Sequence, residues 1–190
     1  MAAQALKVEV DDDELVARIA ARDHGAMRLA ADRHAQLVWR AAYRMLGDAT
    51  EAEDVAQESL LKLWNHADRW KAGGPGIAPW LKKVTVNQCL DRLRRKRFAS
   101  DEEVPEREDE APLADRQIEA SEVGQAVKDC IEALPDRQRA AVILTYYEEA
   151  PNQGAAETME MQLKAFESLL FRARASLKGC GERKGVAGAQ

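Results

Sequence analysis

The stretch that decides the fold is Trp80–Arg97, which reads WLKKVTVNQCLDRLRRKR. At the helical period of about 100° per residue, its apolar side chains fall on one face, namely Val86, Cys89, Leu90 and Leu93. The opposite face carries a ring, an amide and charged groups: Trp80, Asn87, Asp91 and Arg94, with Lys83 and Arg95 beside them. Pro79 fits the first turn, where its missing N–H group costs nothing. The stretch therefore predicts a helix with one buried face and one basic face.

Nucleic acid is a suitable partner for the basic face. Cations contact phosphates, aromatic rings stack on bases, and amides hydrogen-bond to base edges. Positive charge is densest in the last turns, at Arg92, Arg94, Arg95, Lys96 and Arg97, where it also suits the helix dipole. A solvated basic helix end beside a core tryptophan has the same pattern, because basic runs are common. These residues alone leave both interpretations open.

The composition is that of a soluble helical protein. The chain has 190 residues, of which 46% are hydrophobic and 32% are charged, enough for one large or two small domains. No apolar run approaches the roughly 18 residues that span a membrane. The first residues lack the cationic and apolar segments of a secretory signal. We therefore expect a cytoplasmic protein without membrane insertion.

The cysteine pattern predicts no metal site and no disulfide. Cys89, Cys130 and Cys180 are far apart and odd in number, and none belongs to a CxxC or Cys/His motif. We expect ordinary reduced thiols and no cofactor.

The charge is unevenly distributed along the chain. The net charge is −5, yet Trp80–Arg97 carries a single acid, Asp91, among many bases. The segment that follows, from Asp101 to Glu110, is strongly acidic. This asymmetry is typical of a local DNA surface beside an acidic linker.

The first half of the chain predicts an arm and a helical domain. Residues 1–10 form the arm, and residues 11–97 form the domain. Two helices are expected between Asp11 and Leu46, with Gly47 as a natural stop. A capping-box-like start at Asp48–Glu51 opens a third helix to Trp64. The Gly/Pro-rich segment Asp68–Pro79 then interrupts the helices.

The second half predicts a linker, a smaller helical domain and a tail. Residues 98–117 are acidic and contain two prolines, which favours a flexible linker. Residues 118–178 form the second domain, in which helices at 152–159 and 162–177 have the spacing of a helix-turn-helix. A helical hairpin in a bundle has the same pattern. The Gly-rich residues 179–190 are expected to be disordered. The predicted class is all-α, with two helical domains joined by a flexible acidic linker.

The pattern gives little support to an enzyme. Asp54 and Glu58 share one helical face and could act as general acid and base. No nucleophile, histidine or metal-ligand cluster accompanies them. A solvated face, or a face for a protein partner, is favoured.

Four segments, in their order along the chain, resemble the extracytoplasmic-function (ECF) sigma factors, which are small two-domain bacterial transcription initiation factors. They are DATEAEDVAQESLLKLW (Asp48–Trp64), Trp80–Arg97, ALPDRQRAAVILTYYEEA (Ala133–Ala150) and ESLLFRARASL (Glu167–Leu177). The motifs AEDVAQE, WLxxVxxNxxxDxxRR and LPxRQRAAxxL are weak singly and strong in this order. The resemblance covers about Asp12 to Leu177 and implies a sigma factor without an active site of its own.

The resemblance implies roles for individual residues. The helix Asp48–Trp64 would dock on the clamp helices of the largest polymerase subunit. The residues that would lie at this protein interface are Asp54, Gln57 and Glu58. The basic helix and the loop before it would engage the −10 promoter element and capture a flipped base, with Asn87 bearing on base choice. Phosphates would be held by Lys83, Arg92, Arg94 and Arg95, while Asp91 shares their face. Trp80 is either a wedge at the melted edge or a core residue, and its position favours the core.

The second domain resembles the module that reads the −35 element with its final helix. This chain departs there from the family pattern, because the turn and helix start read Met159-Glu160-Met161 and then LKAFES from Leu163. The expected −35 contacts are Lys164, Glu167, Ser168 and Arg172. The implied partners are core RNA polymerase, promoter DNA and an anti-sigma factor.

Two rival interpretations remain open on the residues alone. A sigma-like decoy would sequester an anti-sigma factor without reading DNA, and the altered final helix favours it slightly. Asn87 and the basic run Arg92–Arg97 argue against it, because a decoy needs no phosphate contacts. A helical hydrolase is the more remote alternative.

Overall fold

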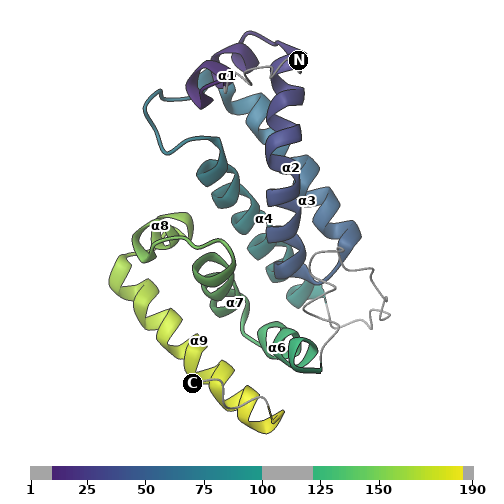
Figure 1. The fold of residues 1–190 in the computed structure, drawn as a ribbon, viewed down its shortest axis with the longest axis vertical. Coiled ribbons are helices and arrows are strands. Elements are labelled where there is room, and N and C mark those ends of the chain that lie inside the picture. Colours follow the sequence, from purple (N-terminus) through teal and green to yellow (C-terminus); the bar gives the residue numbers. More distant parts are fainter. Residues whose placement is uncertain (1–9, 100–121, 186–190) are drawn as a thin grey trace, which may run out of the picture.

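The computed structural model describes residues 10–99 and 122–185, which form helices and turns without any strand (Figure 1). The N-terminal half contains α1 (Asp12–Ala20), α2 (His24–Leu46), α3 (Ala49–His66), the short 3₁₀ helix η1 (Ala67–Arg69) and α4 (Ile77–Ala99). The C-terminal half contains α6 (Glu122–Glu132), α7 (Asp136–Val142), the π-helical turn η2 (Ile143–Tyr147), α8 (Asn152–Thr158) and α9 (Leu163–Arg183). The predicted all-α class is confirmed.

Local side-chain chemistry sets several helix boundaries. Asp23 caps α2, because its carboxylate accepts hydrogen bonds from the N–H groups of Gly25 (2.8 Å) and Ala26 (3.1 Å). Asp48 caps α3 by accepting from the N–H of Glu51 at 2.7 Å. The end of α2 before Gly47 and the start of α3 after Asp48 agree with the sequence prediction.

The apolar core consists of two clusters that meet along α4. One cluster lies within the N-terminal half and includes buried residues of α1 to α4, among them Leu15, Val38, Leu63 and Leu81. The other joins the two halves, since it contains Val55 and Val86 together with Ile143 and Phe166. Figure 1 shows α7 lying between α4 and α9. The two halves therefore share a core in the free chain.

Polar contacts reinforce this junction. Arg139 of α7 donates to the carbonyl of Met45 in α2 at 2.8 Å and also to the carbonyls of Glu132 and Leu134. Burial lowers the pKa of Arg139, but a guanidinium stays charged, so its N–H groups remain available as donors. Arg97 of α4 pairs with Asp136 at the start of α7, at 2.5 Å.

The expectation of three reduced thiols is wrong for two of them. Cys130 of α6 and Cys180 of α9 form a disulfide, with their Cα atoms 5.7 Å apart. Fifty positions separate the two cysteines in the sequence, so only the packing of α6 beside α9 brings them together. Cys89 is a free, buried thiol, and burial raises its pKa to about 12.

The prediction of a disordered tail is wrong for residues 179–183. α9 continues through Gly179 and Gly181 to Arg183, so these residues are helical and not part of a tail that starts after Lys178. The disulfide at Cys180 and the ion pair of Lys184 with Asp129 attach this last part of the helix to α6. Residues 1–9 of the predicted arm, most of the predicted linker and residues 186–190 lie outside the described residues.

The disulfide is expected to stabilise the C-terminal half by restricting its unfolded state. Replacing both cysteines by serine (Cys130→Ser, Cys180→Ser) should lower the free energy of unfolding by about 2–4 kcal/mol. Urea denaturation followed by circular dichroism, with and without dithiothreitol, measures this change. Reductant should bring the native chain to the midpoint of the double variant and leave the variant unaffected. An unchanged midpoint of the native chain in reductant would contradict the prediction.

Candidate nucleic-acid interface

The two faces of α4 lie as their sequence predicts. Leu81, Val86 and Cys89 are buried in the core. Asn87 is partly exposed, and Asp91, Arg94 and Arg95 lie toward solvent on the same side of the helix. Arg94 keeps 67% of its side chain accessible although it pairs with Asp91 at 2.9 Å. An amide and accessible cations therefore share one surface that a nucleic acid can reach.

Trp80 belongs to an aromatic cluster at the start of α4. Its ring stacks on His66 with centroids 5.3 Å apart, and it forms a T-shaped pair with Trp70 with centroids 6.1 Å apart. It packs against the core of the N-terminal half while remaining partly exposed. The structure therefore gives Trp80 a packing role and leaves part of its side chain accessible.

A buried polar network connects α4 to α3. The Ser59 hydroxyl donates to Gln88 Oε1 at 2.6 Å and lies 3.2 Å from the hydroxyl of Thr85. The Gln88 amide in turn donates to Glu58 at 2.8 Å. All three of Ser59, Thr85 and Gln88 are buried, so these bonds satisfy groups that would otherwise destabilise the fold. Sequence reasoning did not select Gln88, because it stands beside the apolar stripe and its partners are on another helix.

The network ends in a charged cluster that combines two predicted sites. Arg92 donates to Glu58 at 2.6 Å and lies 3.8 Å from Asp54, and only 23% of its side chain is exposed. The sequence predicts a phosphate contact for Arg92 and a protein contact for Glu58 and Asp54. Gln57 is exposed and hydrogen-bonds to Glu53. The structure thus ties Arg92 to the acidic face of α3 and leaves the end of α4 nearer to solvent.

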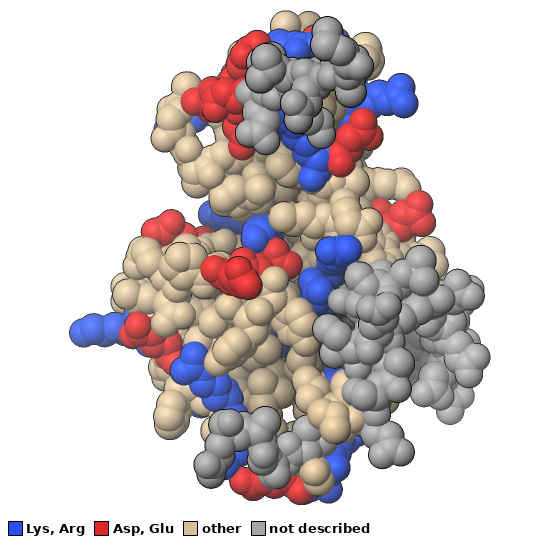
Figure 2. All heavy atoms as spheres, viewed as in Figure 1, with Lys and Arg blue, Asp and Glu red and all other residues tan. Residues whose placement is uncertain are grey.

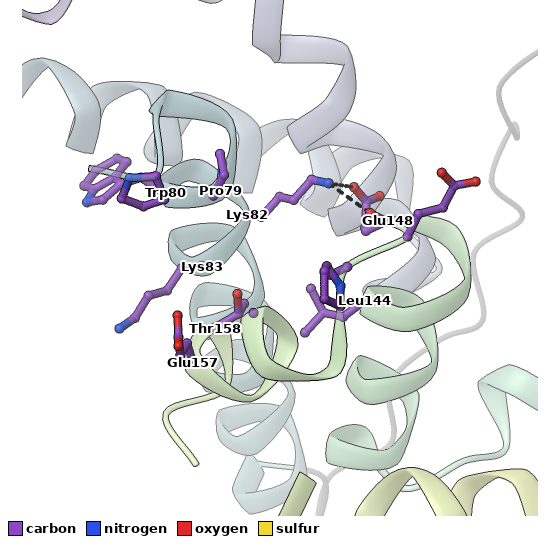
Figure 3. Close-up of a pocket in the computed structure, with 13 residues that line it drawn as sticks. Pro79, Trp80, Lys82, Lys83, Leu144, Glu148, Glu157 and Thr158 are labelled. Atoms are coloured by element: carbon purple, nitrogen blue, oxygen red, sulfur yellow. Dashed lines mark hydrogen bonds and ion pairs between the residues drawn. The ribbon is translucent and has the colours of Figure 1, made fainter. Parts of the chain in front are cut away.

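The first basic residues of α4 are paired with the C-terminal half. Lys82 contacts the carboxylate of Glu148 at 2.9 Å (Figure 3). Arg44 lies 3.7 Å from the same carboxylate, and only 8% of the Glu148 side chain is exposed. Lys83 pairs with Glu160, in the turn between α8 and α9, at 3.1 Å. The sequence predicts that Lys83 contacts a DNA phosphate, whereas in this arrangement of the free chain Lys83 contacts a carboxylate.

A cavity of about 540 Å³ lies along this junction. Its walls come from the start of α4, including Pro79 and Trp80, and from the segment Leu144–Thr158, as Figure 3 shows. Among the described residues, those that line it include no histidine, cysteine or serine. Its polar lining consists of Lys82 and Lys83 on one side and of Glu148, Glu149, Glu157 and Thr158 on the other.

The predicted −35 residues share the outer surface of α9. Lys164, Glu167, Ser168 and Arg172 are exposed, while the buried side of the helix carries Phe166, Leu169, Leu170 and Ala173. Phe171 is 73% exposed beside Arg172, and sequence reasoning missed it because helical spacing alone does not distinguish an exposed phenylalanine from a core one. α8 and α9 are joined by a short turn in which Glu160 has φ of +52°.

The surface charge is mixed where the view shows it. In Figure 2, basic and acidic side chains are interspersed over the described part of this face and do not form one basic patch. No three histidine, cysteine or carboxylate side chains of residues 10–99 and 122–185 gather where a metal ion could bind. None of the helices in these ranges is both long and apolar enough to cross a bilayer.

Two protein-family models match the chain. Residues 30–99 match the model of sigma-70 region 2, and residues 124–177 match the model of sigma-70 region 4. The first match includes α4 with Asn87, and the second includes α8 and α9.

Individual proteins give the same result. The ECF RNA polymerase sigma factor SigE of Mycolicibacterium smegmatis is 30% identical over 76% of this chain and 57% of its own length. SigW of Bacillus subtilis is 25% identical over 82% of this chain and 89% of its own length. The chain thus spans about half the length of SigE and most of SigW.

A solved structure of the sigma factor RpoE in complex with the anti-sigma factor NepR, from Bartonella quintana, has the same fold. Its TM-score is 0.61 at 21% identity, and the match covers 82% of this chain and 96% of RpoE. The two family models are regions of one family and together cover more than half of the chain. The protein therefore belongs to the ECF sigma factors of the sigma-70 family.

Proposed function

We propose that this protein binds core RNA polymerase and directs promoter recognition and melting for transcription initiation, in the cytoplasm and without an active site of its own. The observation that carries the proposal is the accessible surface of α4, where Asn87 lies with Arg94 and Arg95 inside the region 2 match. An amide suits an unpaired base, whose edge is accessible once the strands separate, and the two guanidinium groups suit phosphates.

The proposal assigns one task to each half of the chain. Residues 11–97 would contact core polymerase and the −10 element, and residues 118–178 would contact the −35 element through α9. Asp54, Gln57 and Glu58 would meet the polymerase. Because Arg92 is held by Glu58 and Asp54, its task in this proposal is to fix the acidic face of α3 and not to bind phosphate.

The closed arrangement of the free chain bears on how promoter DNA would be bound. Lys82 and Lys83 are paired with Glu148 and Glu160 of the C-terminal half, so binding of phosphate at Lys83 requires that this pair break. Exposed ion pairs contribute about 0–1 kcal/mol, which polymerase and DNA contacts can exceed. An anti-sigma factor is the further partner that we propose, by analogy with the complex of RpoE and NepR.

The decoy is the second candidate, and the altered surface of α9 is the observation that favours it. The decoy interpretation leaves unexplained why 67% of the Arg94 side chain stays exposed on the same helical face as Asn87. Transcription by core polymerase with and without this protein, from a promoter library, distinguishes the two. A sigma factor gives promoter-dependent transcripts, and a decoy gives none.

Loss of the Asn87 amide should relax promoter choice. In Asn87→Ala, discrimination at one −10 position should fall by about 1–3 kcal/mol, the value of a good amide–base contact. Run-off transcription from promoters with single −10 substitutions measures it. Asn65→Ala, on the exposed surface of α3, is the control that should keep the native preference. If the native protein and Asn87→Ala give the same transcript yield on each promoter variant, Asn87 does not read a base.

Loss of the guanidinium groups near the end of α4 should weaken promoter binding without changing its sequence preference. For Arg94→Ala with Arg95→Ala, the slope of log affinity against log salt should decrease in magnitude by about 2, one for each phosphate that the arginines would neutralise. Fluorescence anisotropy of holoenzyme with labelled promoter at several salt concentrations gives the slope. Arg28→Ala, on the exposed side of α2, should leave it unchanged. If the double variant has the same salt-dependence slope as the native protein, these arginines do not contact phosphates in the promoter complex.

Charge reversal on the acidic face of α3 should impair assembly with core polymerase. Asp54 is 58% exposed and only loosely paired, so Asp54→Lys should reduce affinity for core at least about tenfold while the fold remains intact. Competition with a labelled sigma factor measures the affinity, and circular dichroism checks the fold. Asp68→Lys, on η1, is the matched reversal that should bind normally. Native affinity of Asp54→Lys would exclude this face as the docking site.

A further inference from the structure

Two carboxylates of α1 hold the loop that leads into α4. Asp13 accepts the backbone N–H of Gly73 at 2.7 Å through one oxygen and the indole N–H of Trp70 at 3.0 Å through the other. Asp12 accepts the backbone N–H of Ile77, the first residue of α4, at 2.8 Å. The three bonds therefore fix the beginning, the middle and the end of the segment 70–77.

The loop has few other means of keeping its shape. Residues 71–75 are exposed, so apolar packing does not hold them. Gly73 and Gly76 have φ of +74° and +91°, a region that other residues rarely adopt. A Cβ on Gly76 would lie 2.8 Å from the Asp12 carboxylate, which shows how closely α1 approaches the loop. Hydrogen bonds to α1 are thus the main restraint on this backbone.

Both oxygens of Asp13 are engaged as acceptors. The Gly73 N–H and the Trp70 indole hold the pKa of the Asp13 carboxyl below its ordinary value, so the group is ionised at neutral pH. Trp70 in turn makes a T-shaped contact with Trp80, which stacks on His66. The hydrogen bond from Trp70 to Asp13 and the contact of Trp70 with Trp80 therefore connect α1 to the first turn of α4.

The loop and the basic face of α4 form one continuous surface. Pro75 of the loop lines the same cavity as Trp80 and Lys83 of α4. A displacement of the loop therefore moves one wall of the surface that, under the proposed function, meets the separated DNA strand. α1 itself presents no predicted base contact.

We propose that Asp12 and Asp13 are positioning residues for −10 recognition: they hold the segment 70–77, and with it Trp80, in the geometry that accepts the unpaired strand. This inference rests on the proposed function. It assigns to an acidic helix start, which repels DNA, an indirect part in selecting a promoter.

Asp13→Asn tests the proposal with the smallest change of shape. One of its two side-chain positions becomes an NH₂ group, so either Gly73 N–H or the Trp70 indole faces a donor and loses its acceptor. Hydrogen exchange measured by mass spectrometry should show faster exchange in peptides covering 70–77. The ratio of transcription from the preferred −10 sequence to its single-substitution variants should fall several-fold, with core affinity and −35 preference unchanged.

Two further variants complete the design. Asp11→Asn lies in the same acidic triplet, is exposed and makes no capping hydrogen bond through its side chain, so it should behave as the native chain. Trp70→Phe removes the indole N–H and keeps an aromatic ring, so it should relax −10 preference in the same direction if Asp13→Asn folds poorly.

The possible results distinguish a failure of the positioning role from a failure of the proposed function. Faster exchange at 70–77 with a native −10 preference would overturn the positioning role. An equal loss of output from all promoters would also overturn it, because a merely structural residue behaves in that way. Absence of promoter-dependent transcription with the native chain would instead refute the proposed function, while the exchange data would still report on the contact between α1 and the loop.

Discussion

Burial of the apolar face of α4 is the interaction on which the rest of the structure depends. This helix contacts α2 and α3 in the N-terminal half and α7 and α8 in the C-terminal half. Its residues contribute to both apolar clusters, with Leu81 in one and Val86 in the other. Because the apolar face is turned inward, Asn87 and Arg94 are turned outward, so the same packing that joins the two halves also presents the polar surface.

The charged residues of α4 divide according to their depth. Near the core, Arg92 and Lys82 are bound to carboxylates of other helices and turns, and less than a quarter of each side chain is exposed. Toward the end of the helix, Arg94 is mostly exposed. A charge that leaves water must be paired, whereas an exposed charge keeps its hydration and can exchange partners. Burial therefore decides which cations are committed to carboxylates, and exposure leaves Arg94 available for the proposed contact with DNA.

The polar network between α3 and α4 links the two proposed interfaces. Ser59 and Gln88 are buried, and the chain of hydrogen bonds that begins at Ser59 ends at the exposed carboxylate of Glu58. Glu58 then holds Arg92. These bonds connect the surface of α4 that is proposed to meet DNA with the acidic face of α3, through buried groups that would be costly to leave without partners.

Much of the fold is predictable because its causes are local. The helix start at Asp48, the end of α2 before Gly47 and the two faces of Trp80–Arg97 follow from capping and from the helical period. The predictions fail where a residue's partner is distant. The cysteine spacing gives no sign that Cys130 and Cys180 pair. The pattern likewise marks Asp12 and Asp13 only as acids at a helix start, since nothing near them in the chain indicates their partners in the segment 70–77.

The sequence by itself therefore determined most of the helices and their apolar faces, since these depend on neighbours within about a dozen residues. It also determined the family resemblance, which depends on the order of four motifs along the chain. Only the tertiary structure decided that the two halves share a core, that Arg92 and Lys83 are paired with carboxylates, and that α1 restrains the loop before α4. The physical reason is that hydrogen bonds, ion pairs and disulfides form between atoms a few ångströms apart, and a single sequence specifies which segments come that close only through the packing of the whole chain.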